Sequence, residues 1–253
     1  MIIAFICIVL IFNTMETISI HRPKIVVIGS CNTDMVVKAN RLPVPGETIL
    51  GGTFYMNPGG KGANQAIAAA RLGAEVTFIS KIGYDLFGLQ ALEIYRSEKI
   101  NTEYIFTDQK SPSGVALISV DSFGENSIIV APGASRSLSI EDINKAEEKI
   151  KEADIILMQL EIPIDTVEYA ATIACKYGKK VILNPAPASS LSNSFLRNVH
   201  TILPNRIEAE MLSGIKVMNI ESAHRAAQAI GEKGIENVVI TLGKDGAYVK
   251  EKD

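Results

Sequence analysis

Short β-branched runs that alternate with helical patterns are the feature of this sequence that most constrains its fold. The runs are residues 24–28, 76–82, 155–160, 181–183, 201–203 and 238–242. Helical periodicity lies between them, as in residues 86–97 and 219–233. Short apolar strands separated by helices are typical of a parallel sheet with right-handed crossovers. The sequence therefore predicts an α/β fold with a three-layer, doubly wound, mostly parallel sheet.

Capping residues mark the ends of two further helices. Ser139 precedes an apolar stripe within residues 140–150, which predicts one amphipathic helix after that cap. Asp165 and Glu168 have the spacing of a capping box, and Gly178 is expected to close the helix that they begin.

Two segments, at about residues 35–56 and 113–130, interrupt the alternation and carry strand patterns instead. The first has strand-like pieces at 35–37, 48–50 and 53–55, separated by prolines and glycines. The second is typical of a hairpin that turns around residues 122–124. We expect the two insertions to form one small β sheet that stands off the main body as a lid. An ordinary edge meander is the alternative.

Residues 57–73, with the sequence NPGGKGANQAIAAARLG, run from a glycine-rich turn into a helix that Gly73 should end. Glycines let the backbone approach a ligand closely, and free N–H groups of a first helical turn favour an anionic or oxygen-rich guest. Lys61 adds a charge and Asn64 an amide. A tight turn into a core helix is the alternative. A nucleotide P-loop is excluded, because Gly62 stands where that motif needs a hydroxyl.

Polar residues follow several of the predicted strands. Because the carboxyl ends of parallel strands share one edge of a sheet, these residues should line one cleft, which the glycine-rich helix start also faces. Asn32 and Asp34 have the groups to clasp hydroxyls, although an Asx turn is the simpler explanation for either alone. The full set is Asn32, Asp34, Glu161, Asn184, Asn205 and Thr241.

The composition of the chain excludes some classes of binding partner. A net charge of −3 and a pI near 5.7 argue against a nucleic-acid surface. The three cysteines are scattered, without metal or disulfide spacing, which suits a reducing compartment and predicts a cytoplasmic protein.

The N-terminal residues 1–12 are apolar but too few to span a membrane, so no membrane partner is expected. We expect residues 1–23 to be an extension outside the fold, with a weak signal or anchor as the alternative.

Several motifs then fall in one familiar order along the chain. They are GSCNTD at 29–34, PGET at 45–48, GGKGANQA at 59–66, MQLE at 158–161, NPAPA at 184–188, PNRIEAE at 204–210 and TLGKDG at 241–246. With them the sequence resembles the ribokinase-like (phosphofructokinase B type) carbohydrate kinases. GGKGANQA with NTD and MQLE is typical of the ribokinase branch.

The resemblance implies a role for each matching residue. The sugar, D-ribose, would be held by Asn32, Thr33, Asp34, Gly60, Lys61, Gly62, Ala63, Asn64 and Glu161. ATP would be held by Asn205 and by Thr241, Leu242, Gly243, Lys244, Asp245 and Gly246. Glu208 would organise Mg²⁺ through water, and K⁺ or another monovalent ion would activate the enzyme. The resemblance also implies in-line transfer to the ribose 5-hydroxyl and a homodimer formed through the lid sheet.

Two departures from the family pattern qualify these expectations. Arg206 stands where relatives usually have an acidic or polar residue, which leaves the N-x-x-E pair intact but changes the local charge. The glycine-alanine-glycine-aspartate segment that supplies the family's catalytic base does not occur up to Asp253. We therefore expect residues 24–253 to be an incomplete kinase domain with turnover near zero as it stands. Kinases of deoxyribose, fructose or a nucleoside, or a non-catalytic sugar-binding remnant, are the alternatives.

Overall fold

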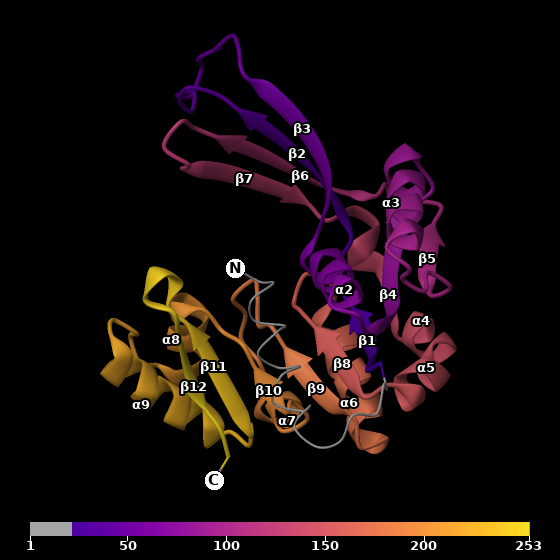
Figure 1. Ribbon diagram of the computed structural model, residues 1–253, viewed down its shortest axis with the longest axis vertical. Coiled ribbons are helices and arrows are strands. Elements are labelled where there is room, and N and C mark those ends of the chain that lie inside the picture. The colour runs from indigo at the N-terminus through magenta and orange to yellow at the C-terminus, as the bar shows by residue number, and fades with distance from the viewer. Residues whose placement is uncertain (1–21, 253) are drawn as a thin grey trace.

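The computed structural model describes residues 22–252, which form an eight-stranded sheet and a separate four-stranded sheet (Figure 1). Apart from its last two residues, the expected N-terminal extension lies outside the described residues. The prediction of a large, mostly parallel sheet accompanied by a small second one is confirmed.

The large sheet is parallel throughout except at one edge. Its strands, in spatial order, are β12 (Ala247–Lys250), β11 (Asn237–Thr241), β10 (Thr201–Ile202), β9 (Lys180–Leu183), β8 (Ile155–Met158), β1 (Lys24–Ile28), β4 (Glu75–Gly83) and β5 (Ile105–Asp108). Only β12 runs antiparallel to its neighbour. The central strands are buried on both faces, which is why they read as continuous β-branched runs rather than as alternating patterns.

Helices cover both faces of this sheet and make the three layers. In β1, Ile25 and Val27 pack toward α2 (Lys61–Arg71) and α3 (Leu86–Ser97), whereas Val26 and Ile28 pack toward the other face. That second face is covered by α4 (Ile140–Lys145), α5 (Glu147–Glu152), α6 (Ile164–Lys176), α7 (Asn193–Leu196), α8 (Arg206–Ser213) and α9 (Ile220–Gly231).

Two helix predictions are wrong in detail. The single helix expected over residues 140–150 is two short helices, α4 and α5, that meet at Ala146. Asp165 does not cap α6, because that helix already begins at Ile164 with Pro163 at the N-cap and no side-chain cap. Proline presets the backbone angle at a helix start, so the chain enters the helix before the acidic residue is reached.

The small sheet, called the lid sheet below, stands away from the body at the top of Figure 1. Its order is β3 (Thr53–Gly59), β2 (Asn32–Lys38), β6 (Gly114–Val120) and β7 (Asn126–Ala131), with β2 and β6 parallel. Residues 48–50 form no strand, contrary to expectation. The lid sheet also begins earlier than predicted, because β2 starts inside the polar cluster at Asn32 and β3 runs into the glycine-rich stretch.

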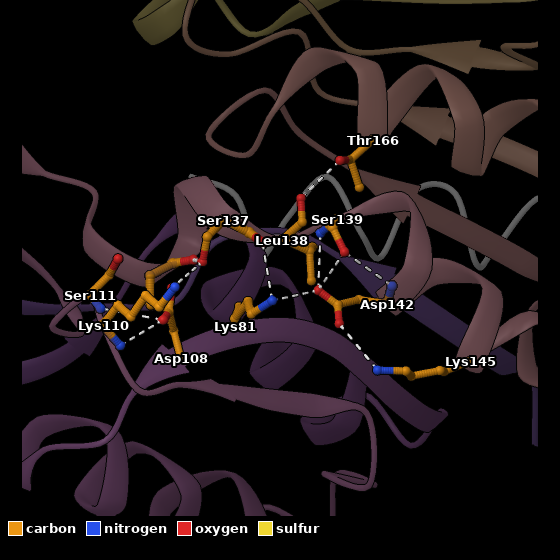
Figure 2. Close-up of polar contacts among 11 residues, drawn as sticks. Lys81, Asp108, Lys110, Ser111, Ser137, Leu138, Ser139, Asp142, Lys145 and Thr166 are labelled. Carbon is orange, nitrogen blue, oxygen red and sulfur yellow. Dashed lines mark hydrogen bonds and ion pairs between the residues drawn. The ribbon is translucent and has the colours of Figure 1, made fainter.

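A polar network fastens the chain where it returns from the lid sheet to the body (Figure 2). Lys81 on β4 donates to the Ser137 carbonyl at 3.1 Å and to Asp142 Oδ2 at 2.8 Å. Asp108, at the end of β5, accepts from the Ser137 hydroxyl at 2.6 Å. Since the Lys81–Asp142 pair is largely shielded from water, it anchors the returning segment to α4 more firmly than an exposed pair would.

The start of α2 lies directly against the loop that follows β1. A Cβ atom on Gly62 would approach the backbone of Gly29 and Ser30 to 2.7 Å, and one on Gly60 would approach the Ser30 carbonyl oxygen to 2.9 Å. Gly60 also has a φ of 88°, which favours glycine. These glycines are therefore required by the close approach of two protein segments.

We expect Gly62→Ala to lower the free energy of unfolding by about 1–3 kcal/mol, because the added methyl must displace backbone rather than a flexible side chain. Urea denaturation measures this loss. Gly231→Ala in α9 is the matched control, since its Cβ would meet only the end of the Lys250 side chain. That variant should stay within about 1 kcal/mol of the parent or gain stability. An equal effect of both substitutions would contradict the explanation.

Candidate functional site

The carboxylate of Glu161, just beyond β8, is the centre of the candidate site. One oxygen accepts from the Lys61 backbone N–H at 2.9 Å and from the Ser30 hydroxyl, and the other pairs with the Lys61 ammonium. Burial by itself would raise the pKa of Glu161, but these hydrogen bonds outweigh it and the pKa lies below its ordinary value. The residue is therefore an ionised acceptor at neutral pH.

The first turn of α2 is occupied by protein groups, which corrects the expectation of free N–H groups there. The Lys61 N–H donates to Glu161, and the Ala63 N–H donates to the Ser30 carbonyl at 3.0 Å. Glu161 thus takes the place at the positive end of the helix that an anionic guest was expected to take. Any ligand bound here must be held mainly by side chains around Glu161.

Asp34 lies beside this ion pair, at the root of the lid sheet. Burial and the negative charge of Glu161 raise its pKa above the ordinary value, and the positive charge of Lys61 opposes the shift. Within residues 22–252 no hydrogen bond reaches the Asp34 carboxylate. Asn32, two positions earlier on the same face of β2, has a buried Oδ1 atom with no partner among the described residues. Two acceptors therefore stand ready for hydroxyl donors.

Three residues of the expected sugar set are placed differently. Thr33 lies on the opposite face of β2 from Asn32 and Asp34, because side chains alternate along a strand. Ala63 is fully buried in the core beneath α2, and Gly62 faces the loop after β1. Asn64, in contrast, is exposed on the first turn of α2 next to Lys61. The structure thus gathers Asn32, Asp34, Gly60, Lys61 and Glu161 around one place, and the Asn64 N–H donates to the Gly60 carbonyl in the adjoining first turn of α2.

A buried pair of amides beneath the site had no predicted role. Gln159 Nε2 donates to Gln65 Oε1, which links the end of β8 to α2. Gln159 Oε1 is buried without a partner in the described part of the chain and lies against Gly29. Gln159 belongs to the MQLE motif and Gln65 to the GGKGANQA motif. Their position within these motifs was the signal in the sequence that they lie near the site.

The second group of expected residues lies at the start of α8. Asn205 Oδ1 accepts from the Glu208 N–H at 2.9 Å, and Asn205 N and Nδ2 each donate to the Glu208 carboxylate at 2.8 Å. Asn205 also forms an isolated parallel bridge with Thr241. This reciprocal capping box fixes α8 against the end of β11.

The loop of residues 241–246 leaves two backbone donors available. The N–H groups of Leu242, Asp245 and Gly246 are used within the loop. The N–H groups of Gly243 and Lys244 have no partner among the described residues. Leu242 is buried in the core, whereas the side chains of Lys244 and Asp245 are exposed. Free adjacent N–H groups in a tight turn form an anion-binding concavity.

Lys61 is the cation that joins the two groups electrostatically. Its positive charge opposes the burial that raises the pKa values of Asp34 and Glu208, and it adds to the hydrogen bonds that lower the pKa of Glu161. Burial still raises the pKa of Glu208 above its ordinary value, despite its bonds to Asn205. Among the described residues no three His, Cys, Asp or Glu side chains form a metal-binding cluster. A metal here would need ligands from water or from a bound substrate.

Comparisons with known proteins identify the family to which this chain belongs. A model of the pfkB family carbohydrate kinase matches residues 22–253. A ribokinase of Haemophilus influenzae is 46% identical over 231 residues, which cover 91% of this chain and 76% of that protein. A deoxyribokinase of Salmonella typhi is 38% identical over 230 residues, covering 90% and 75%. The structure of Arabidopsis thaliana ribokinase complexed with ribose and ATP has a TM-score of 0.81 at 30% identity, covering 91% and 75%.

The chain belongs to the pfkB family of carbohydrate kinases. It spans about three quarters of the length of the ribokinase and deoxyribokinase relatives. The comparisons support a sugar kinase and give no support to the expectation that this chain is inactive. None of the helices in residues 22–252 has the length and apolar character needed to cross a membrane.

Asp34→Asn should raise the free energy of unfolding at pH 7.5. The folded-state pKa of Asp34 lies above its unfolded value of about 3.9, so ionising this group destabilises the folded state as pH rises through the folded pKa. The gain from Asn should therefore vanish as pH falls below about 4. Urea denaturation between pH 4 and 8 measures it.

Asp85→Asn is the control of opposite sign. Burial alone would raise the pKa of Asp85, but bonds from Ser113 and Gly88 bring it below its ordinary value. Its ionised form stabilises the fold above the unfolded pKa, so the variant should lose stability at pH 7.5. An Asp34→Asn variant less stable than the parent at that pH would show that the carboxylate is not strained by its surroundings.

Proposed function

We propose that this protein is a ribokinase-type enzyme that transfers the γ-phosphoryl group of ATP to the 5-hydroxyl of D-ribose. The observation that carries the proposal is the ionised Glu161–Lys61 pair with Asp34 beside it and no hydrogen bond reaching the Asp34 carboxylate within residues 22–252. A sugar supplies the hydroxyl donors that such acceptors need. The ribokinase relatives and the structure of a ribokinase complexed with ribose and ATP support the same choice.

On the sugar side, each hydroxyl has a group of matching chemistry. Asp34 and Asn32 Oδ1 accept from neighbouring ring hydroxyls, while Lys61 and Asn64 donate to sugar oxygens. Glu161 has one oxygen held by Ser30 and the Lys61 N–H, so its role is to fix the sugar through the remaining lone pairs. We assign Thr33, Gly62 and Ala63 to the walls around this group rather than to direct side-chain contacts.

On the nucleotide side, phosphates would meet the free N–H groups of Gly243 and Lys244, and Asn205 would contact the same ligand. Mg²⁺ suits Glu208, because this ion keeps several waters and takes one or two carboxylates plus substrate phosphates. Both oxygens of Glu208 already bind Asn205, which favours contact through water. When bound, Mg²⁺ would neutralise phosphate charge. No residue of the described chain is assigned to K⁺.

Phosphoryl transfer depends on positioning and on electrostatic stabilisation. The residues of this chain contribute by holding the sugar at the carboxyl edge of the sheet, beside the start of α8 and the loop of residues 241–246. Lys61 supplies positive charge between the two groups. No described residue is assigned as the catalytic base.

Deoxyribose phosphorylation is the second candidate, because a deoxyribokinase is 38% identical to this chain. The two sugars differ by one hydroxyl. A buried acceptor left without that hydroxyl costs about 1–3 kcal/mol, which is roughly a tenfold to hundredfold difference in affinity. Asp34 and Asn32 Oδ1, which accept no hydrogen bond from any described residue, favour ribose, because ribose carries the additional donor.

In this proposal residues 24–253 belong to one kinase domain, in which the insertions at about 35–56 and 113–130 form a lid over the sugar. The cytoplasm, where ATP and free sugars meet, is the proposed location.

A homodimer through the lid sheet is part of the proposal. Met56, Met35, Leu117 and Ile129 form one cross-strand row on one face of the lid sheet, and Tyr55, Ile128 and Val130 are exposed on the other. Apolar side chains gathered on both faces of a thin sheet mark an interaction surface. A second copy of the same sheet would cover them symmetrically.

Leu117→Asp should convert the dimer to a monomer, because a charge in the middle of an apolar interface is left without a partner. Sedimentation velocity measures the mass. Met211→Asp on α8 is the matched control, since Leu117 and Met211 are both 52% exposed as whole residues. A parent chain that sediments as a monomer would remove the dimer from the proposal, as would a Leu117→Asp variant that remains dimeric.

The substrate test compares D-ribose, 2-deoxyribose and fructose by calorimetric binding and by ADP release. Ribose should bind at least tenfold more tightly than 2-deoxyribose, and Asn64→Ala should weaken ribose more than ATP. Ribose affinity should also fall as pH drops through the raised pKa of Asp34. Equal or better results with fructose would remove the ribose assignment, and an ATP-only defect in Asn64→Ala would contradict the sugar site.

A further inference from the structure

The ion pair between Arg206 and Asp245 joins the start of α8 to the loop of residues 241–246. Arg206 Nη2 donates to Asp245 Oδ2 at 2.7 Å and to the Leu242 carbonyl at 3.1 Å. Nη1 donates to the Val217 carbonyl at 3.4 Å. One guanidinium therefore contacts three separate points around the nucleotide side of the site, two of them in this loop.

The position of Arg206 makes these contacts significant. It is the first residue of α8, where the helix dipole disfavours a cation. Its side chain is 29% exposed, so it is partly withdrawn from water as well. A cation kept in such a place must be held by its partners, and the partners here are the Asp245 carboxylate and backbone carbonyls of the loops.

Asp245 places a negative charge where the proposed phosphate would bind. Its carboxylate lies in the same turn as the N–H groups of Gly243 and Lys244, the proposed phosphate donors, which have no acceptor in the described part of the chain. An uncompensated negative charge there would repel a polyphosphate, whose own charge is large and negative. Arg206 is the cation that pairs with Asp245 in the described part of the chain, so it cancels that charge.

We infer that Arg206 is a positioning residue for nucleotide binding, which neutralises Asp245 and holds the Leu242–Asp245 turn open to an incoming phosphate. This inference rests on the proposed ATP function. It adds a residue that the family resemblance marks only as a departure. Within residues 22–252 no hydrogen bond or ion pair joins Arg206 or Asp245 to the residues of the sugar side, so ribose affinity should be independent of Arg206.

The test measures ATP and D-ribose binding by calorimetry for the 253-residue chain and four variants. Arg206→Ala should weaken ATP by about tenfold at low salt, because it exposes the charge of Asp245. Asp245→Asn should leave ATP affinity within about threefold of the parent or tighten it. The double variant should recover at least half of the loss on a logarithmic scale, because the two residues act as a pair. Ribose affinity should not change in any of them.

Arg71→Ala is the control, because Arg71 forms an arginine–glutamate pair with Glu98 at the C-terminal end of α2. It should leave ATP affinity unchanged. An Arg206→Ala variant that binds ATP like the parent overturns the inference. A double variant as weak as Arg206→Ala also overturns it, because charge neutralisation would then not be the cause.

Hydrogen exchange separates this inference from the proposed function. If the parent binds ribose but no ATP, the proposed kinase function fails on its nucleotide side. The positioning role is then decided by exchange at the Asp245 and Gly246 amides, which bond within the turn. Faster exchange in Arg206→Ala than in Arg71→Ala supports the role in holding the turn. Equal exchange overturns it.

Discussion

The hydrogen bonds around the Glu161 carboxylate hold together the three segments that make the sugar side of the site. Glu161 follows β8, Ser30 lies in the loop after β1, and Lys61 begins α2, 100 positions away from Glu161 in the sequence. A carboxylate at the positive end of a helix, with a lysine ammonium against it, is stabilised by both the dipole and the opposite charge. Because β2 and β3 begin and end beside these segments, the lid sheet is rooted on the same contact.

The fold was predictable because its strands are buried on both faces. Runs such as Lys24–Ile28 then carry a clear strand signal, and in the large sheet the direction of every strand but β12 follows from the helices between the strands. The break at Ala146 between α4 and α5 was not predictable, since alanine is the best helix former and gives no local stop signal. Pro163, in contrast, does indicate the start of α6, but the capping-box spacing of Asp165 and Glu168 led to a later predicted start.

The sequence predicted which residues meet at the candidate site better than it predicted how those residues contact one another. Strand direction brought Glu161, Asn205 and Thr241 to one edge. It did not reveal that Glu161 fills the start of α2, because that contact joins residues far apart in sequence. Thr33 was expected beside Asn32 and Asp34. It lies between them in β2, and because side chains alternate along a strand, its side chain points to the opposite face of the sheet. The Oδ1 atom of Asn32 and the Oε1 atom of Gln159, buried without partners among residues 22–252, lie beside or beneath this site, as expected where a structure retains polar groups for binding.

The parallel pairing of β2 with β6 gives the lid sheet a particular place in the order of folding. Asn32 pairs with Gly114 and Lys38 with Val120, and the intervening chain contains β3, α2, β4, α3 and β5. Closing that loop costs entropy, and the pairing of β1 with β4 and of β4 with β5 lowers the cost because it brings the two lid segments closer together. Until β2 and β6 pair, the antiparallel pairs β2–β3 and β6–β7 each keep an open inner edge that can pair with other chains. A newly made chain is therefore exposed to aggregation through the lid until its own body has joined these two edges.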